Sequence, residues 1–361
     1  MPTPRLELSV GTAVSRFLDL ASALPGTAVH YAVKANPHPV LLRALAQAGC
    51  RFDVASPEEA RAALAAGAPA AHLLHSNPVA RRDRLAEVHA LGVRLFVVDS
   101  PAEVAKLAAA APGASVLVRI VTSGDGADWP LSRKYGCRVD DAATVLGLAA
   151  ASGLDPAGVS FHVGSQQRDP RAWAAPVRSA ARVFAAARRA GLRPWLLDLG
   201  GGFPADLDGA APPLEVYGRS IRHCLEEAFG RDVPDTLAEP GRGVVGDAGT
   251  VVARVIGVVD RGGDRWVFLD AGVFSGLVET LDEAIRYRLE VPGVGGPTGP
   301  CVLAGPTCDS ADVLYERTPA RLPLALAEGD EVRLHAAGAY TTCYSTVGFN
   351  GFDPLPTVLV R

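Results

Sequence analysis

Short apolar runs rich in β-branched residues recur along the first 240 positions, and longer segments rich in alanine and leucine separate them. Each run is apolar throughout and ends on a polar residue or a glycine, as expected of parallel strands buried on both faces. The runs predicted as strands are 28–36, 51–56, 73–77, 95–100, 115–120, 158–165, 196–202 and 236–242.

The segments between these strands carry signals for the start and the end of helices. SPEE at 56–59 and SPAE at 100–103 place proline at the first helical position and glutamate where a capping box requires it. Gly49, Gly67 and Gly191 stand where helices should end. Eight strands, each followed by a helical stretch, predict a (β/α)8 barrel.

The pattern changes near residue 250, where strand-like runs alternate with Gly/Pro turns and helix signals become few. This predicts an α/β chain in which a barrel over 11–248 precedes an antiparallel β domain over 249–361. We expect the apolar alternation within 1–10 to supply a further strand to that β domain.

Composition narrows the classes of function. The chain has 361 residues, 48% hydrophobic and 20% charged, with a net charge of -4. Nucleic acid is not expected as a partner, because phosphate binding needs a basic face. No apolar run reaches the roughly 18 residues of a membrane span, and the first residues do not resemble a signal peptide, so we expect a cytoplasmic protein. Six scattered cysteines without a C-x-x-C pair argue against disulfides and zinc, and most should be reduced and buried.

Reactive or phosphate-holding groups gather where the predicted barrel strands end, which is the face that carries the active site in such barrels. Any one of them alone is more readily explained as a polar residue of the core, but their shared position favours a functional site. They are Lys34, Asp53, His162, Ser165, Gly200, Gly201, Gly202, Glu239 and Arg242.

These residue types suit one cofactor. The GGGF motif at 200–203 lets backbone N–H groups approach an anion, and Arg242 adds a fixed positive charge, which indicates a phosphate. A lysine whose pKa is lowered by burial, here Lys34, is a nucleophile toward an aldehyde. His162 can stack on a flat ring, and Glu239 can keep a ring nitrogen protonated. Together they predict a site for pyridoxal 5'-phosphate (PLP).

A second glycine motif does not indicate a dinucleotide site. GRGVVG at 241–246 fits the G-x-G-x-x-G spacing of dinucleotide-binding folds. It follows the last predicted barrel strand, however, and precedes a strand-like segment, whereas a dinucleotide site requires a helix there.

The motifs YAVKANP, FDVAS, FHVGSQ, LGGGFP, EPGR, GPTCDSAD and FNGF occur in the order found in fold-type III PLP-dependent decarboxylases. From about residue 28 to the C-terminus the chain resembles bacterial ornithine and lysine/ornithine decarboxylases most. ADWPLSRKYGC and SGLVETLDEAIRY strengthen that resemblance. It implies decarboxylation of a basic L-amino acid by a homodimer with shared active sites.

The resemblance also implies a role for each matching residue. Lys34 would carry the cofactor, with Asp53 beside it, His162 on the ring face and Glu239 at the ring nitrogen. Cys308 of the partner subunit would protonate the product carbon. The implied phosphate ligands are Ser165, Gly201, Gly202, Arg242 and Tyr340; the implied substrate contacts are Asp309, Tyr340, Phe349 and Asn350.

One departure from the family pattern concerns the residue that binds the distal amine of the substrate. Eukaryotic ornithine decarboxylases carry an aspartate where this chain has Ala271, so a second acid must come from elsewhere. Glu279, Asp282 and Glu283 are the candidates, each more readily explained as part of a solvated helix face.

Several alternatives stay open. A diaminopimelate-type decarboxylase would bind a distal carboxylate of its substrate, and the acid Asp309 argues against this. An alanine-racemase-like enzyme would pair the ring nitrogen of the cofactor with arginine, and Glu239 argues against that. An inactive homologue with a binding or regulatory role should have lost Lys34, Cys308 or the glycine loop. The choice among ornithine, lysine and longer amines, and between polyamine biosynthesis and a specialised pathway, is likewise open.

Overall fold

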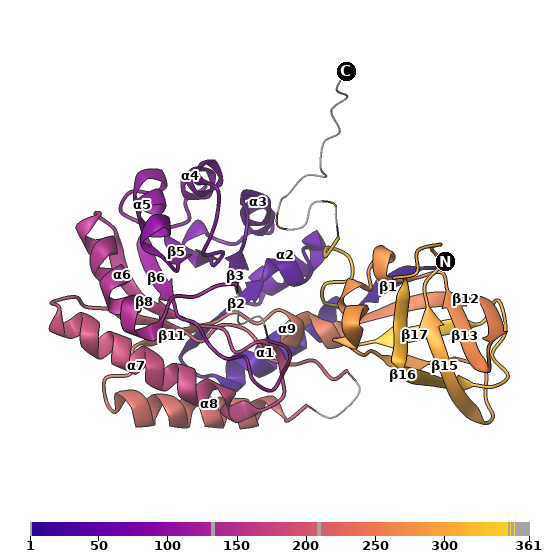
Figure 1. Cartoon of the computed structure of the whole chain (residues 1–361). Helices are drawn as coiled ribbons and strands as arrows, with labels where there is room; N and C mark the ends of the chain where they lie inside the picture. Colours follow the sequence, from indigo (N-terminus) through magenta and orange to yellow (C-terminus); the bar gives the residue numbers. More distant parts are fainter. Residues whose placement is uncertain (1, 131–133, 208–210, 346, 348–349, 351–361) are drawn as a thin grey trace, which may run out of the picture.

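The structure is a computed structural model that describes residues 2–130, 134–207, 211–345, 347 and 350. It consists of a barrel ringed by helices and a β domain beside it (Figure 1). None of the helices in these ranges is long and apolar enough to cross a membrane.

Eight parallel strands close the barrel, and β11 pairs with β2 to complete it. They are β2 (Thr27–Ala32), β3 (Arg51–Val54), β4 (Leu73–His75), β5 (Leu95–Val98), β6 (Ser115–Arg119), β8 (Asp155–Ser160), β10 (Leu196–Asp198) and β11 (Asp235–Ala238). All eight predicted strands are confirmed, but most end two to four residues before the sequence pattern suggested. Several residues predicted at strand ends therefore lie beyond the strands, and Lys34 belongs to a 3-10 turn, η1 (Val33–Ala35).

The helices between the strands begin and end at the predicted signals. Ser56 Oγ accepts a hydrogen bond from Glu59 N and Ser100 Oγ accepts one from Glu103 N. Gly49, Gly67 and Gly191 adopt φ values of +89°, +98° and +83°. The helices are α1 (Val10–Ala23), α2 (Pro39–Gln47), α3 (Pro57–Ala65), α4 (Arg82–Ala90), α5 (Pro101–Ala110), α6 (Val139–Ala151), α7 (Ala174–Arg189), α8 (Leu214–Phe229) and α9 (Arg242–Val245). Short 3-10 segments are η2 (Ala70–His72), η3 (Pro170–Trp173), η4 (Gly246–Ala248), η5 (Val273–Ser275) and η6 (Val278–Glu283).

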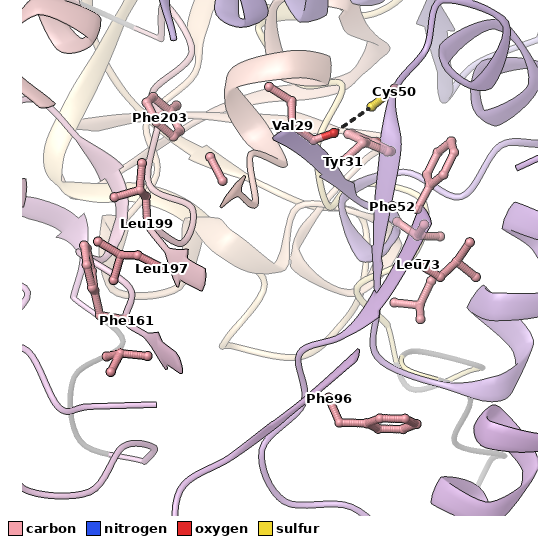
Figure 2. Packing of buried hydrophobic residues seen from close by; sticks show 14 of the residues in the cluster. Val29, Tyr31, Cys50, Phe52, Leu73, Phe96, Phe161, Leu197, Leu199 and Phe203 are labelled. Carbon is pink, nitrogen blue, oxygen red and sulfur yellow. Dashed lines mark hydrogen bonds between the residues drawn. The ribbon is translucent and has the colours of Figure 1, made fainter. Parts of the chain in front are cut away.

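Apolar side chains fill the space on both sides of the barrel strands. Leu74, Val97, Leu117, Leu196 and Leu237 cluster inside the barrel. A larger cluster, part of which Figure 2 shows, includes aromatic side chains such as those of Tyr31, Phe52, Phe96 and Phe161. The barrel is thus a packed core, and the polar strand ends lie at one rim of it.

The β domain is a sheet of seven strands in which β1 pairs antiparallel with β12. Its strands are β1 (Arg5–Leu8), β12 (Gly249–Arg261), β13 (Asp264–Leu269), β14 (Arg288–Glu290), β15 (Thr298–Ala304), β16 (Val313–Pro323) and β17 (Glu331–His335). The expected sheet is not antiparallel throughout, because β13 and β15 run parallel. The connection between them contains η5, η6 and β14, and such a long crossover returns the chain in its original direction. A small antiparallel pair, β7 (Ala127–Trp129) with β9 (Ser165–Gln167), lies outside both sheets.

A buried histidine on β2 should make the fold sensitive to acid. Burial lowers the pKa of His30 from 6.5 to about 4, so the unfolded chain takes up this proton at a higher pH than the folded chain does. The stability that depends on neutral His30 is therefore complete above pH 6.5 and lost as the pH falls toward 4. Compared with His30→Gln, wild type should lose about 2 kcal/mol more unfolding free energy between pH 7 and pH 5. Urea denaturation at both pH values measures this, and an equal loss in the two proteins would contradict it.

Candidate active site

Lys34 and Asp53 form an ion pair at the rim of the barrel. Lys34 Nζ donates a hydrogen bond of 3.0 Å to Asp53 Oδ2, and Ser76 Oγ donates to the other carboxylate oxygen. The side chain of Asp53 is 1% exposed and that of Lys34 is 33% exposed. The ends of β2, β3 and β4 therefore meet in a fixed arrangement with the ammonium on the open side.

The expected lowering of the Lys34 pKa is wrong. Burial does act to lower it, but the charge of the Asp53 carboxylate and its hydrogen bond to Nζ act in the opposite direction and raise the pKa. Lys34 is therefore an ammonium at neutral pH. It can react as a nucleophile only after it loses a proton, and Asp53 Oδ2 lies within hydrogen-bonding distance of that proton.

The glycine loop that follows β10 allows other groups to approach closely. Gly200 has φ of +66°, and its C=O accepts a hydrogen bond of 2.9 Å from Glu239 N. A Cβ atom on Gly201 would lie 2.7 Å from Glu239 O and 2.9 Å from His162 Nε2. Gly201 therefore lies between His162 and Glu239 with no room for a side chain. Gly202 joins the loop to β9, because its C=O accepts from Gln167 N at 2.9 Å.

His162 follows β8 and presents a neutral ring. Its Nδ1 accepts a hydrogen bond of 2.9 Å from Gly164 N. Burial lowers its pKa well below the usual value, and the positive charges of Arg119 and Lys34 add to this effect. Ser165, half-buried, begins β9 shortly after it. A neutral flat ring beside a glycine suits stacking on a planar ligand.

Glu239 is buried with an unmet acceptor. It is 7% exposed, and its Oε1 has no hydrogen-bond partner in the described ranges. Burial raises its pKa well above the usual value, and the nearby acids Asp198 and Asp53 raise it further. A cationic N–H donor placed against Oε1 would relieve both effects.

Arg242 offers unmet donors. It is 3% exposed, and its NH2 donates to Glu279 Oε1 at 2.6 Å and to Oε2 at 2.7 Å. Its Nε and NH1 are buried without a partner among the described residues. Its Cζ lies 5.1 Å from the ring centroid of Tyr340, whose backbone N donates to Ala35 O in the Lys34 turn at 2.7 Å.

The three acids considered for the distal amine have other partners. Glu279 pairs with Arg242, Asp282 Oδ1 accepts from Arg317 at 2.8 Å, and Glu283 Oε2 accepts from Arg286 at 2.8 Å. The replacement for the acid absent at Ala271 is thus not found in this group within a single chain.

Cys308 and Asp309 lie in a loop of the β domain and not at the end of a barrel strand. Both are exposed, in the loop between β15 and β16, and Asp309 Oδ1 accepts from Ala311 N at 2.8 Å. Asn350 Nδ2 donates to Glu59 Oε1 at 3.2 Å, whereas Phe349 lies outside the described residues.

Of the six cysteines, all free, only Cys50, Cys224 and Cys301 are buried, fewer than expected.

Asp198 is a buried acid of the site that the motif search did not single out. It is 0% exposed, and it accepts hydrogen bonds from Ser160 Oγ at 2.6 Å and from Gly200 N at 2.8 Å. Burial raises its pKa to about 7. Its place at the end of β10, directly before the glycine loop in LLDLGGG, could have indicated that it belongs to the site.

The unpartnered polar groups of Glu239 and Arg242 suit PLP. The cofactor carries an anionic phosphate for the free donors of Arg242 and a protonatable ring nitrogen for Glu239 Oε1. Lys34 and His162 supply the amine and the ring face that such a ligand needs.

Comparisons with known proteins agree with this chemistry. A family described as "Pyridoxal-dependent decarboxylase, pyridoxal binding domain" matches residues 10–246. A lysine/ornithine decarboxylase of Selenomonas ruminantium is 36% identical over 99% of this chain and 90% of its own length. The crystal structure of SrLDC with PLP and cadaverine has a TM-score of 0.86 at 35% identity, over 99% of this chain and 91% of that one. The lysine/ornithine decarboxylase of Vibrio vulnificus with putrescine has a TM-score of 0.85 at 32% identity, covering 99% and 94%.

One relative does not bear a decarboxylase name. Antizyme inhibitor 2 of Xenopus laevis is 31% identical over 96% of this chain and 78% of its own length. Similarity across the whole chain therefore does not separate enzymes from relatives with another role, and the separation depends on individual residues.

Proposed function

The chain belongs to the pyridoxal-dependent decarboxylase family, and on that basis we propose that it decarboxylates L-ornithine or L-lysine to putrescine or cadaverine and CO2. The observation that carries this proposal is the set of unmet buried groups, Glu239 Oε1 and Arg242 Nε and NH1, at the rim that bears Lys34. When bound, PLP supplies an electron sink for the charge left behind by CO2.

The residues of the chain then have separate tasks. Asp53 Oδ2 holds and takes up the proton of Lys34 Nζ. Glu239 Oε1 would accept a hydrogen bond from the ring nitrogen of the cofactor, and the neutral ring of His162 would cover one face of that ring. The phosphate would be held by Ser165, Gly201, Gly202, Arg242 and Tyr340.

The site is completed by a second subunit in this proposal. The exposed loop of Cys308 and Asp309 enters the partner's site, where Cys308 protonates the product carbon and Asp309 binds the distal ammonium of the substrate. Phe349 and Asn350 belong to the same junction. We therefore propose a cytoplasmic homodimer that supplies polyamine precursors.

The alternatives are separated by residues and by two measurements. An inactive homologue comparable to antizyme inhibitor 2 should lack a reactive group, whereas Lys34, Glu239 and Cys308 are all present. A visible absorption band that borohydride abolishes would show that the cofactor is bound through the lysine. Release of CO2 from a panel of amino acids, with diaminopimelate included, then decides the substrate.

A basic distal group should be required for turnover. Asp309 offers a carboxylate to an ammonium in a site closed by the second subunit, and a substrate without that ammonium leaves the carboxylate unpaired. Norvaline, which matches ornithine but lacks its distal amine, should therefore have a kcat/KM lower by about tenfold or more. Equal kcat/KM values for norvaline and for the best basic substrate would rule out the ammonium pocket.

A further inference from the structure

The salt bridge between Arg242 and Glu279 joins the two parts of the molecule. Arg242 begins α9, just after the last barrel strand, and Glu279 lies in η6 of the β domain. Arg242 is 3% exposed and Glu279 is 6% exposed. This buried pair therefore connects the rim of the barrel to a segment that contributes nothing else to the site described above.

The geometry of this pair is unusual for arginine and a carboxylate. Two nitrogens commonly donate in parallel to the two oxygens. Here one nitrogen, NH2, donates to both oxygens of Glu279, at 2.6 and 2.7 Å. The other two nitrogens, Nε and NH1, are buried and unpartnered within the part of the chain that the structure describes.

A buried N–H without an acceptor costs about 1–3 kcal/mol. Nε carries one such hydrogen and NH1 carries two. Because Glu279 accepts only from NH2, its carboxylate fixes the guanidinium without using these donors. An anion that met them would remove the cost.

A second contact fixes the plane of the guanidinium. The ring of Tyr340 lies 5.1 Å from Arg242 Cζ, and Tyr340 is attached through its backbone to Ala35, next to Lys34. Glu279 thus holds one end of the guanidinium while Tyr340 covers its face. The free donors of Arg242 are in this way held at a constant place relative to the Lys34 turn.

We propose that Glu279 is the positioning residue of the phosphate end of this site: from the β domain it orients Arg242 so that Nε and NH1 meet a phosphate monoester. This inference rests on the proposed function, because the phosphate concerned is that of PLP. It assigns Glu279 to the cofactor, not to the distal amine of the substrate.

The experiment compares two ligands that differ only in the phosphate. Dissociation constants of PLP and of pyridoxal are measured by fluorescence for wild type, Glu279→Ala, Glu279→Gln and the control Asp282→Asn, after removal and return of the cofactor. Asp282 lies in the same segment, but its side chain is 83% exposed and pairs with Arg317 at the surface. The preference for PLP over pyridoxal isolates the contribution of the phosphate end.

Glu279→Ala should reduce this preference by about tenfold, chiefly by weakening PLP while leaving pyridoxal unchanged. Glu279→Gln, whose amide oxygen still accepts one N–H, should reduce it about threefold, and Asp282→Asn should not change it.

Each outcome decides a different question. If wild type prefers PLP and Glu279→Ala keeps the full preference, the role of Glu279 is overturned while the proposed function stands. If wild type itself shows no preference for PLP, the proposed function fails. Should Glu279→Ala not fold, which circular dichroism would show, Glu279→Gln decides, because an unchanged preference in that variant overturns the proposal as well.

Discussion

Lys34→Ala should lose the borohydride-trapped cofactor adduct and slow turnover by several orders of magnitude. The reason is that Nζ is the amine of the rim, held 3.0 Å from Asp53 Oδ2, and no other described residue offers an amine at this ion pair. The adduct is measured by mass spectrometry after reduction and turnover by release of CO2. PLP should still bind through its phosphate and ring, so cofactor content should fall less than activity.

The control is Lys106→Ala. Lys106 lies in α5 and pairs with Glu103 at 2.6 Å, so it belongs to a different ion pair from that of Lys34 and Asp53. It should keep the adduct and the rate of wild type. A Lys34→Ala protein with both a normal adduct and a normal rate would end the assignment.

Mixing inactive Lys34→Ala with inactive Cys308→Ala should restore activity to roughly a quarter of wild type per total site. If Lys34 acts in one subunit and Cys308 in its partner, each mixed dimer has one site with both changes and one with neither. Random exchange makes half of the dimers mixed, so one site in four is intact. The exposed position of Cys308, in a loop of the β domain, is what leads us to expect this result.

Exchange of subunits must be shown first, by purification through two different tags. With mixed dimers in hand and activity still absent, Cys308 cannot act across the interface. Activity of Cys308→Ala alone at the level of wild type would remove it from the mechanism altogether.

The barrel could be predicted from the sequence because its signals are local. An uninterrupted apolar run predicts a strand buried on both faces, and Ser56 and Ser100 mark helix starts within a few residues of themselves. The strand ends were placed too late because apolar residues continue into the turns: Val33 and Ala35 are buried, yet they flank Lys34 in a 3-10 turn. Burial alone does not separate a strand from the turn that follows it.

Properties that depend on distant partners could not be predicted. The sequence indicated that Lys34 is buried, but the direction of its pKa follows from Asp53, which lies on another strand. Glu279 resembled a residue of a solvated face because its neighbours Asp282 and Glu283 are charged, whereas its partner is 37 residues away in the barrel. The parallel pairing of β13 with β15 depends likewise on a crossover without a local sequence signal.

The pairing of β1 with β12 affects how the chain can fold during its synthesis. Leu8 lies opposite Gly249 and Arg5 opposite Val252, so the first strand leaves the ribosome long before its partner exists. The barrel likewise cannot close until β11 has been synthesised, because β2 pairs with β11. Non-local pairings of this kind are slow to form and leave strand edges exposed meanwhile. A nascent chain stalled before Gly249 would therefore carry an unpaired β1, and we expect chaperones to bind there until translation has passed β12.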